Sequence, residues 1–308
     1  MRGRILVTGA TGFIGGRLAR RLTSDGWQVR ALVRDPTSVG ARALESEGIE
    51  VHSGDVLSPR SLRDSLLGVD MAYYLIHSMG RGNPRDYAVA DRSAAAGFAE
   101  LARAHGVTRT IYLGGLGDQP HSPHLRSRHE TARVLGEHGP PLTYFRAGMV
   151  VGPQSESYRT LRYLVQRLPA MIAPGWLKNP TQPIGIDDTL SYLADALDND
   201  ASSGQEIQIG GPDVLAYGEM LDRMAQVLGV PRRPRIPIPL LTPWLSSLWI
   251  GLVTPVDAGV VRPLIEGLAE PTVVTDPAGM DLFDLEPVGF DEALRRAVAQ
   301  DPDLVVAA

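Results

Sequence analysis

Cysteine is absent from the 308-residue chain and lysine is nearly so, because Lys178 is the single lysine among 30 basic residues. Without cysteine there are no disulfide bonds, no thiolate nucleophiles and no cysteine-ligated zinc. A Walker A phosphate loop and Schiff-base chemistry are excluded as well, since each needs a lysine at a defined place. Lys178 lies in the turn-like segment 176–180, where we expect a solvated surface charge.

An excess of positive charge and an export signal are also missing. The 30 basic and 35 acidic residues give a net charge of −5, which supplies no basic field for nucleic acid or an anionic membrane. Residues 1–4 lead directly into a strand-like run without the apolar core of a signal peptide, so we expect a cytoplasmic protein. No nucleic-acid partner is expected.

The most apolar stretch, residues 240–256, is interrupted by proline near both ends. It reads LLTPWLSSLWIGLVTPV and is about as long as the shortest membrane spans. Pro243, Pro255 and the hydroxyl side chains within the stretch argue against a crossing of the bilayer. We expect a buried helix or a lid over an apolar pocket, and no integral membrane span.

Short apolar runs alternate with helix-like segments in the first half of the chain. The runs that predict strands are residues 5–8, 29–33, 49–52, 71–76, 110–113 and 142–145. Ser58 and Asn83 each precede a proline, as at many helix starts, and Gly106 follows a long amphipathic segment. Strands that alternate with helices form right-handed βαβ units. The predicted fold class is therefore α/β, with a Rossmann-type doubly wound parallel sheet.

Proline and glycine break up this pattern after Gly148. We expect two unequal domains: residues 1–150 form the doubly wound domain, and residues 151–308 form a smaller mixed α/β lobe with some segments returning to the first domain. Helices are predicted at residues 187–198 and 217–228. Doubly wound folds bind ligands at the carboxyl edge of the sheet, so the lobe is expected to cover that edge and to hold a substrate.

Three glycines mark the turn after the first strand, Gly9, Gly12 and Gly15. Gly9 allows a tight turn, Gly12 lets backbone amides approach a pyrophosphate, and Gly15 lets the next helix lie close to the sheet. A position between a strand and a helix is the context that this motif requires. The motif predicts a dinucleotide site in the first domain. Further cofactor contacts are expected from Thr11, Phe13 and Ile14.

The end of the second strand bears on the choice of cofactor. Arg34 stands where an NAD site normally places a carboxylate, and its guanidinium can instead hold a 2′-phosphate, with Arg17 assisting. We therefore expect NADP(H) in preference to NAD(H). In the alternative interpretation Arg34 is a surface residue and Asp35 serves NAD. Asp55 and Val56, after the third strand, are expected at the adenine edge, unless Asp55 is a turn residue or helix cap.

Several strings resemble the extended and atypical branches of the short-chain dehydrogenase/reductase superfamily. They are TGATGFIGG, GDV after the third strand and YFRAGMVVGP after the sixth. YLIHSMG, YLGGLGD, SPHLRSRHE, TQPIGIDD and IGGPDVL are similar to a bacterial atypical subgroup of NAD(P)-binding proteins with NmrA-like relatives. The resemblance spans the whole chain without naming a reaction. It implies cofactor contacts from Ile76, His77 and Gly114.

The chain departs from this superfamily at the catalytic pair. A typical member has serine after the fifth strand and Tyr-x-x-x-Lys on the next helix, with the tyrosine as proton donor. In this chain His124 and Arg128 occupy the tyrosine and lysine places. We predict a nonstandard site with His77 or His124 as proton donor and Arg128 or Arg146 as electrostatic partner. Alternatively, His77 bonds to backbone and His124 is a helix-start residue facing water.

Four histidines crowd one segment, His121, His124, His129 and His138, without suggesting a metal site. Two of them precede the expected helix, and the other two are nine residues apart, which turns them to opposite sides of it. No carboxylate stands at the spacing that would complete a ligand set. We expect no bound metal.

Polar residues of the second half are expected near the substrate. Gln182, Asp187 and Asp188 correspond to positions that flank the substrate pocket in related reductases, although either aspartate also suits a helix N-cap. Residues 155–158 are expected to line the pocket mouth. The tryptophans and the stretch 240–256 suggest an apolar cleft, and core packing explains them equally well.

These features together favour a reductase that uses NAD(P)H and acts on a hydrophobic carbonyl, quinone or enone. A non-catalytic NAD(P)-binding sensor or scaffold is one alternative, because NmrA-like regulators keep the nucleotide site without the catalytic pair. A redox-neutral isomerase or cyclase is another. The protein is expected to be a monomer or a homodimer.

Overall fold

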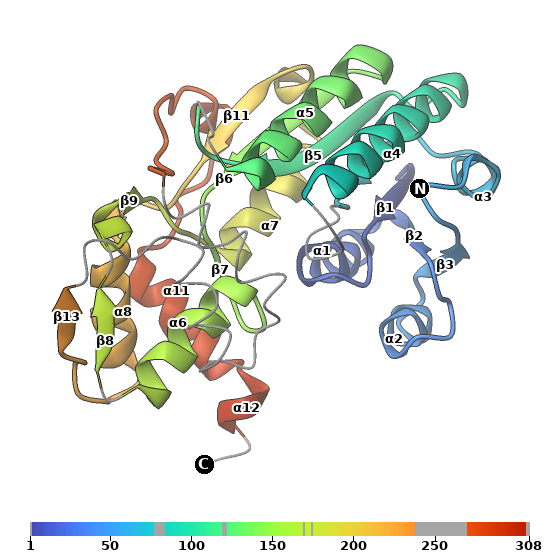
Figure 1. The fold of residues 1–308 in the computed structure, drawn as a ribbon. Coiled ribbons are helices and arrows are strands. Elements are labelled where there is room, and N and C mark those ends of the chain that lie inside the picture. Colours follow the sequence, from blue (N-terminus) through green and yellow to red (C-terminus); the bar gives the residue numbers. More distant parts are fainter. Residues whose placement is uncertain are drawn as a thin grey trace.

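The computed structural model describes residues 2–76, 84–118, 122–168, 170–173, 175–237 and 270–305 (Figure 1). Its centre is a seven-stranded sheet in the order β11-β6-β5-β4-β1-β2-β3, in which every neighbouring pair is parallel. The strands are β1 Arg4–Thr8, β2 Gln28–Val33, β3 Glu50–Ser53, β4 Met71–Tyr74, β5 Arg109–Gly115, β6 Leu142–Ala147 and β11 Glu206–Ile209. The predicted doubly wound parallel sheet is confirmed.

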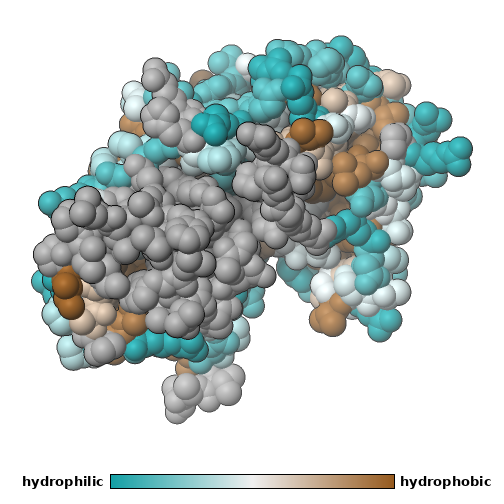
Figure 2. All heavy atoms as spheres, viewed as in Figure 1, coloured by the Kyte–Doolittle hydropathy of each residue, from teal (hydrophilic) through white to brown (hydrophobic). Residues whose placement is uncertain are grey.

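Helices cover both faces of the sheet. Three of them pack on one face, α1 Phe13–Ser24, α2 Val39–Ser46 and α7 Ile186–Asp195, and three on the other, α3 Pro59–Ser65, α4 Pro84–Ala104 and α5 Pro123–His138. With both faces covered, the strands are apolar along most of their length. On the surface seen in Figure 2, hydrophilic residues cover much of the coloured area between smaller hydrophobic patches.

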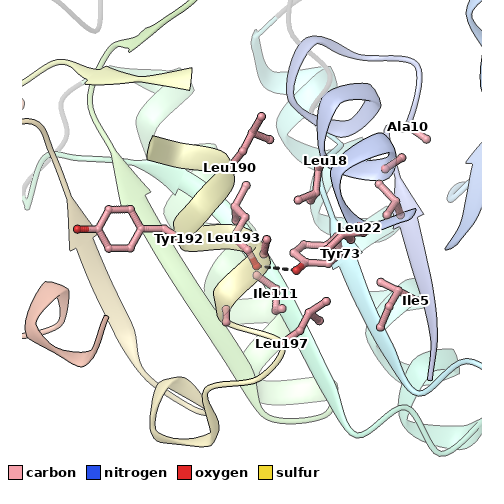
Figure 3. Close-up of a cluster of buried hydrophobic side chains, with 14 of the residues drawn as sticks. Ile5, Ala10, Leu18, Leu22, Tyr73, Ile111, Leu190, Tyr192, Leu193 and Leu197 are labelled. Carbon is pink, nitrogen blue, oxygen red and sulfur yellow. Dashed lines mark hydrogen bonds between the residues drawn. The ribbon is translucent and has the colours of Figure 1, made fainter. Parts of the chain in front are cut away.

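Consecutive tyrosines of β4 show how the two faces are built. Tyr73 and Tyr74 point to opposite faces, as neighbouring strand residues do. Tyr73 is fully buried and its hydroxyl donates to the Leu193 carbonyl at 2.6 Å, which ties α7 to the middle of the sheet (Figure 3). Leu18 of α1 packs in the same cluster. A segment far along the chain is thereby fixed beside the first helix.

The second half of the chain supplies a lobe with its own apolar core. Its helices are α6 Glu156–Arg167, α8 Tyr217–Val227, α11 Phe290–Ala299 and the short α12 Pro302–Val305. Its strands form three pairs, β7 Val150–Val151 with β10 Ile184–Gly185, β9 Pro180–Thr181 with β12 Leu215–Ala216, and β8 Met171–Ala173 with β13 Arg235–Pro237. The second half of the chain also contains α7 and β11, but α7 packs on the large sheet and β11 is one of its strands. The domain boundary at residue 150 stays a prediction.

Most sequence-predicted elements are present, with corrections at their ends. The helices predicted at 187–198 and 217–228 are α7 and α8, but the N-cap of α7 is Gly185, and Asp187 and Asp188 lie in its first turn. Asn83 and residues 240–256 lie outside the described residues. Among the helices that the structure describes, none is long and apolar enough to cross a membrane.

Candidate functional site

The turn between β1 and α1 and the first turn of α1 each have one position at which only glycine fits. Gly9 has φ +65°, and a Cβ there would lie 2.5 Å from the Leu75 carbonyl oxygen. A Cβ on Gly15 would lie 2.3 Å from the Gly9 carbonyl oxygen. Gly12 is the N-cap of α1 and donates its own amide to Gly9 at 2.9 Å. The amides of the first turn of α1 have no acceptor within the helix and can hold an anion.

The sequence suggested that Arg17 assists Arg34 at a 2′-phosphate. In the structure, the Arg17 side chain is held elsewhere. Its guanidinium lies over the Phe13 ring at 4.5 Å and donates to the carbonyls of Phe13 and Pro153, both at 3.1 Å. Burial, followed by the nearby Arg20 charge, lowers the pKa of Arg17. Arg17 therefore fastens α1 to the chain segment that follows β7.

The carboxyl end of β2 presents exposed cations. Arg34 and the Arg42 side chain on α2 are exposed and make no hydrogen bond or ion pair within the described part of the chain, while the Arg42 charge also acts on Asp35. Asp35 instead accepts two bonds from Thr37, at 2.6 Å from the hydroxyl and 2.8 Å from the amide. These bonds hold the pKa of Asp35 below its usual value. The carboxylate that would serve NAD is engaged, and the arginines are not.

The turn after β3 gives a mixed outcome for the adenine edge. The Asp55 carboxylate accepts the Leu57 amide at 2.9 Å, as in the alternative turn interpretation. The Val56 side chain is buried, so its backbone alone can face a ligand. Leu57 is 58% exposed and Val39, at the start of α2, is 88% exposed. Sequence analysis missed these two apolar side chains, which flank the ends of adjacent strands.

His124 and Arg128 lie one turn apart on α5 and meet at the carboxyl end of β5. Arg128 Nε lies 3.3 Å from His124 Nε2, and Arg128 Nη1 donates to the Leu113 carbonyl at 2.9 Å. His124 is the second residue of α5 rather than a residue that precedes the helix. The structure thus brings together the two residues at the tyrosine and lysine places.

The surroundings of His124 bear on its predicted role as a proton donor. Burial and the adjacent Arg128 charge lower its pKa to about 3. The imidazole is therefore neutral at pH 7, and a protonated His124 is not available as a general acid. Arg128 carries the positive charge of the pair, since a guanidinium does not lose its proton in this range.

Gly114 and Gly115, at the end of β5, leave room for side chains. A Cβ on Gly114 would lie 2.7 Å from the Tyr144 ring, and one on Gly115 would lie 2.6 Å from Leu125. Tyr144 is buried and stacks on Tyr112 with ring centroids 5.4 Å apart. Burial raises the pKa of both tyrosines, so neither supplies the missing acid. Tyr144 was not singled out from the sequence, because nothing local marks it.

The sequence that forms this site is similar to those of known proteins. A model of the NmrA-like family matches residues 1–229. The chain belongs to the NmrA-like family. The predicted resemblance to NmrA-like proteins is confirmed.

Two curated relatives of this NmrA-like chain are reductases by name. A ceramide reductase of Caulobacter vibrioides is 28% identical over 245 residues, which cover 77% of this chain and 75% of the relative. An NAD(P)H azoreductase of Xenophilus azovorans is 26% identical over 237 residues, which cover 74% and 75%.

Solved structures share the fold of the NmrA-like chain. Triphenylmethane reductase of a Citrobacter species superposes with a TM-score of 0.76 at 16% identity and covers 96% of this chain and 100% of that one. The NADPH-dependent quinone oxidoreductase QOR2 of Escherichia coli, complexed with NADPH, gives 0.74 at 19% identity and covers 94% and 98%. At these identities the likeness establishes the fold alone.

Arg146 braces the sheet edge of this NmrA-like protein rather than facing a reacting group. Its side chain is 5% exposed and pairs with Glu206 at 2.6 Å and Asp118 at 2.9 Å. It also donates to the carbonyls of Gly115 at 3.3 Å and Gly117 at 2.7 Å. These partners hold the Arg146 guanidinium in place, and its electrostatic role stays a prediction, as does that of Arg128.

Other predicted substrate residues also hold the lobe together. Gln182 accepts the Val274 amide at 3.0 Å and donates to the Gly211 carbonyl at 2.7 Å. Tyr158, expected at the pocket mouth, is fully buried and donates to Asp301 at 2.9 Å. These side chains are occupied by structural hydrogen bonds.

The two aspartates of α7 line a small pocket between α7 and α11. Asp188 accepts the Val288 amide at 3.2 Å, and burial raises its pKa. Asp187 lies 3.7 Å from Arg296 on α11. Both aspartates therefore join α7 to the lobe.

Some predicted residues lie outside the described part of the chain. They are His77, His121, Trp244 and Trp249, together with the side chain of Trp176. Ile76, which precedes His77, is half-buried. Within the described residues, no three histidine, aspartate or glutamate side chains are grouped to hold a metal ion.

Proposed function

We propose that this NmrA-like protein is an NADPH-dependent reductase of electron-poor, apolar acceptors such as quinones and enones. The observation that carries the proposal is the position of the His124–Arg128 pair at the carboxyl end of β5. The strand order reverses between β1 and β4, and doubly wound folds bind their ligands across that point. The pair lies on one side of this point, and the glycine turn lies on the other.

The residues at the glycine turn fit a dinucleotide phosphate. The first-turn amides of α1 suit the pyrophosphate. Gly12 has no Cβ, and a side chain at this position would narrow the approach to these amides. Arg34 and Arg42 suit a 2′-phosphate, which favours NADP(H) over NAD(H). Val39 and Leu57 offer apolar surface to the adenine ring. Ile76, His77 and Gly114 remain the predicted neighbours of the nicotinamide.

Arg128 is the residue we assign to the chemistry. A bound NADPH supplies a hydride. Arg128 stabilises the negative charge that an acceptor gains at the end of β5, because its guanidinium lies in a partly desolvated place. His124 is neutral and positions Arg128, so we expect the proton of the reduced product to come from solvent. This favours acceptors that delocalise charge and need no strong acid.

The named relatives support a reductase acting on apolar compounds, since one is called a ceramide reductase and another an NAD(P)H azoreductase. A non-catalytic NADP(H) sensor is the second candidate. It is favoured by the chemistry of the described site, where His124, Tyr112 and Tyr144 are all unsuited to donate a proton at pH 7.

Turnover of a panel of quinones, enones and azo compounds by the purified protein tests the proposal. We expect oxidation of NADPH with at least one acceptor, and we expect Arg128→Met to lower kcat by about a hundredfold. Arg133→Met is the matched control, because Arg133 is on the same helix but pairs with exposed glutamates. NADPH binding without turnover of any acceptor would favour the sensor.

A further inference from the structure

A strap of residues 270–276 crosses from the lobe to the sheet edge. On the lobe side, the Thr272 hydroxyl bonds the Thr181 hydroxyl at 2.5 Å and the Thr272 carbonyl accepts the Gln182 amide at 2.9 Å. The Val274 amide donates to the Gln182 side chain at 3.0 Å. The strap is therefore fastened to β9 and the residue after it by both backbone and side chains.

The same strap is fastened to the sheet. The Thr275 amide donates to Gln208 of β11 at 2.7 Å, and the Thr275 hydroxyl lies 3.0 Å from Asp118. Asp118 in turn pairs with the buried Arg146. These bonds join the strap to β11, to the chain after β5 and to β6.

Glu270, at the head of the strap, contacts the start of α5. Its carboxylate accepts the Ser122 amide at 2.6 Å, across 148 residues of sequence. Ser122 is buried and is the N-cap of α5, where its hydroxyl accepts the Leu125 amide at 3.2 Å. A buried amide at this position has no partner in the helix, so Glu270 satisfies a group that would otherwise be unpaired. A carboxylate is also favourable at a helix N-terminus.

The first turn of α5 carries His124 and leads to Arg128. The Arg128 side chain is tied to β5 through the Leu113 carbonyl and donates to the His124 ring at 3.3 Å. Because His124 belongs to the first turn of α5, its position against Arg128 follows the position of that turn. Ser122 is two residues before His124, and Glu270 is its partner from outside the helix.

We infer that Glu270 is a positioning residue for the His124–Arg128 pair. Glu270 fixes the first turn of α5. Because the strap is anchored to both the lobe and the sheet, Glu270 also fixes the position of that turn relative to the lobe. The kinetic part of this inference rests on the proposed reductase function. The structural part does not depend on it.

The kinetic test compares Glu270→Ala, Glu270→Gln and the parent with NADPH and an accepted quinone. We expect Glu270→Ala to lower kcat about tenfold at an unchanged KM for NADPH. Glu270→Gln is expected to recover most of this loss, because the amide oxygen still accepts the Ser122 amide. Glu137→Gln, in the last turn of the same helix, is the matched control and is expected to keep the parental kcat.

Two results would overturn the inference from kinetics. One is a parental kcat in Glu270→Ala. The other is a parallel loss of kcat and NADPH affinity in all Glu270 variants, which would indicate a general loss of structure rather than positioning.

A second measurement keeps the inference testable without turnover. Amide hydrogen exchange in the first turn of α5 is expected to rise at least tenfold in Glu270→Ala and to stay at the parental rate in Glu137→Gln. The His124 imidazole, followed by NMR, is expected to titrate at a higher pH in Glu270→Ala, since a loosened turn exposes it. Unchanged exchange and titration would refute the role of Glu270. If these changes appear but no acceptor is reduced, the proposed function fails and the positioning role stands.

Discussion

The two ends of the sheet's carboxyl edge are built differently. At the proposed nucleotide end, the glycine turn offers backbone amides, and the exposed arginines Arg34 and Arg42 make no hydrogen bond or ion pair within the described residues. At the other end, Arg128 and Arg146 are engaged with carbonyls and side chains from distant segments. A site made of backbone and unpaired charge can be detected from a local motif. A site made of paired side chains depends on which segments meet.

Burial separates the two ends as well. Asp35 is exposed, and hydrogen bonds to Thr37 lower its pKa. His124 and Tyr144 are shifted by burial in the first place, toward the neutral form in both cases. The groups at one end therefore meet water, and those at the other end are largely shielded from it, as the proposed function requires.

The sharpest way to break this comparison is to remove the backbone-built end. Gly15→Ala places a Cβ against the Gly9 carbonyl, so we expect a loss of about 3 kcal/mol in the free energy of unfolding and loss of dinucleotide binding. Gly97→Ala is the control, because its Cβ would meet nothing within 4 Å in α4 and should stabilise by about 0.5 to 1 kcal/mol. Urea unfolding and calorimetric titration measure both effects, and parental binding by Gly15→Ala would contradict the assignment of the turn.

A smaller effect is expected from the unpaired cations. Arg34→Asp should weaken NADPH binding by about 1 to 3 kcal/mol, because charge-assisted bonds to the 2′-phosphate are lost and repulsion is added. NADH binding should change little. Arg63→Asp makes the same charge change on α3 and should leave NADPH affinity at the parental value. Equal losses of NADPH affinity in the two variants would show that Arg34 contributes only through the overall charge of the protein.

A further effect, on stability rather than on ligand binding, concerns pH and the buried end. The pKa of His124 is lowered from its ordinary 6.5 to about 3, so the folded protein resists a proton that the unfolded chain accepts. The contribution of the neutral His124 to the free energy of unfolding is complete above pH 6.5 and falls as the pH drops from 6.5 toward 3. His124→Gln should flatten this fall in urea unfolding at a series of pH values, with His138→Gln as the matched control. An unchanged slope in His124→Gln would show that the histidine is solvated.

Local patterns were sufficient for much of the fold. The apolar runs gave the strands β1 to β6, since a parallel sheet covered on both faces requires continuous apolar segments. The resemblance put His124 and Arg128 at the tyrosine and lysine places, and the structure brings the two side chains together. The lowered pKa of His124 could not be predicted, because desolvation depends on neighbours that the spacing does not reveal.

The partners of residues that bond to distant segments could not be predicted. Arg146 was expected as an electrostatic partner and Gln182 near a substrate; those roles stay predictions, and the structure adds the partners in other segments that hold both side chains. Glu270 was not considered, because its partner Ser122 lies 148 residues away. Gly114 was expected beside the cofactor, while the structure adds a packing reason, the Tyr144 ring.

By itself the sequence determined the alternation of strands and helices, the glycine turn and the lack of a Tyr-x-x-x-Lys pair. These are properties of neighbouring residues, set by backbone sterics, hydrophobic periodicity and residue type. Tertiary structure alone decided that Asp35 is engaged, that Arg146 is a brace and that Glu270 caps α5. The reason is physical: a charged side chain takes its protonation state and its role from the groups that folding brings within hydrogen-bond distance.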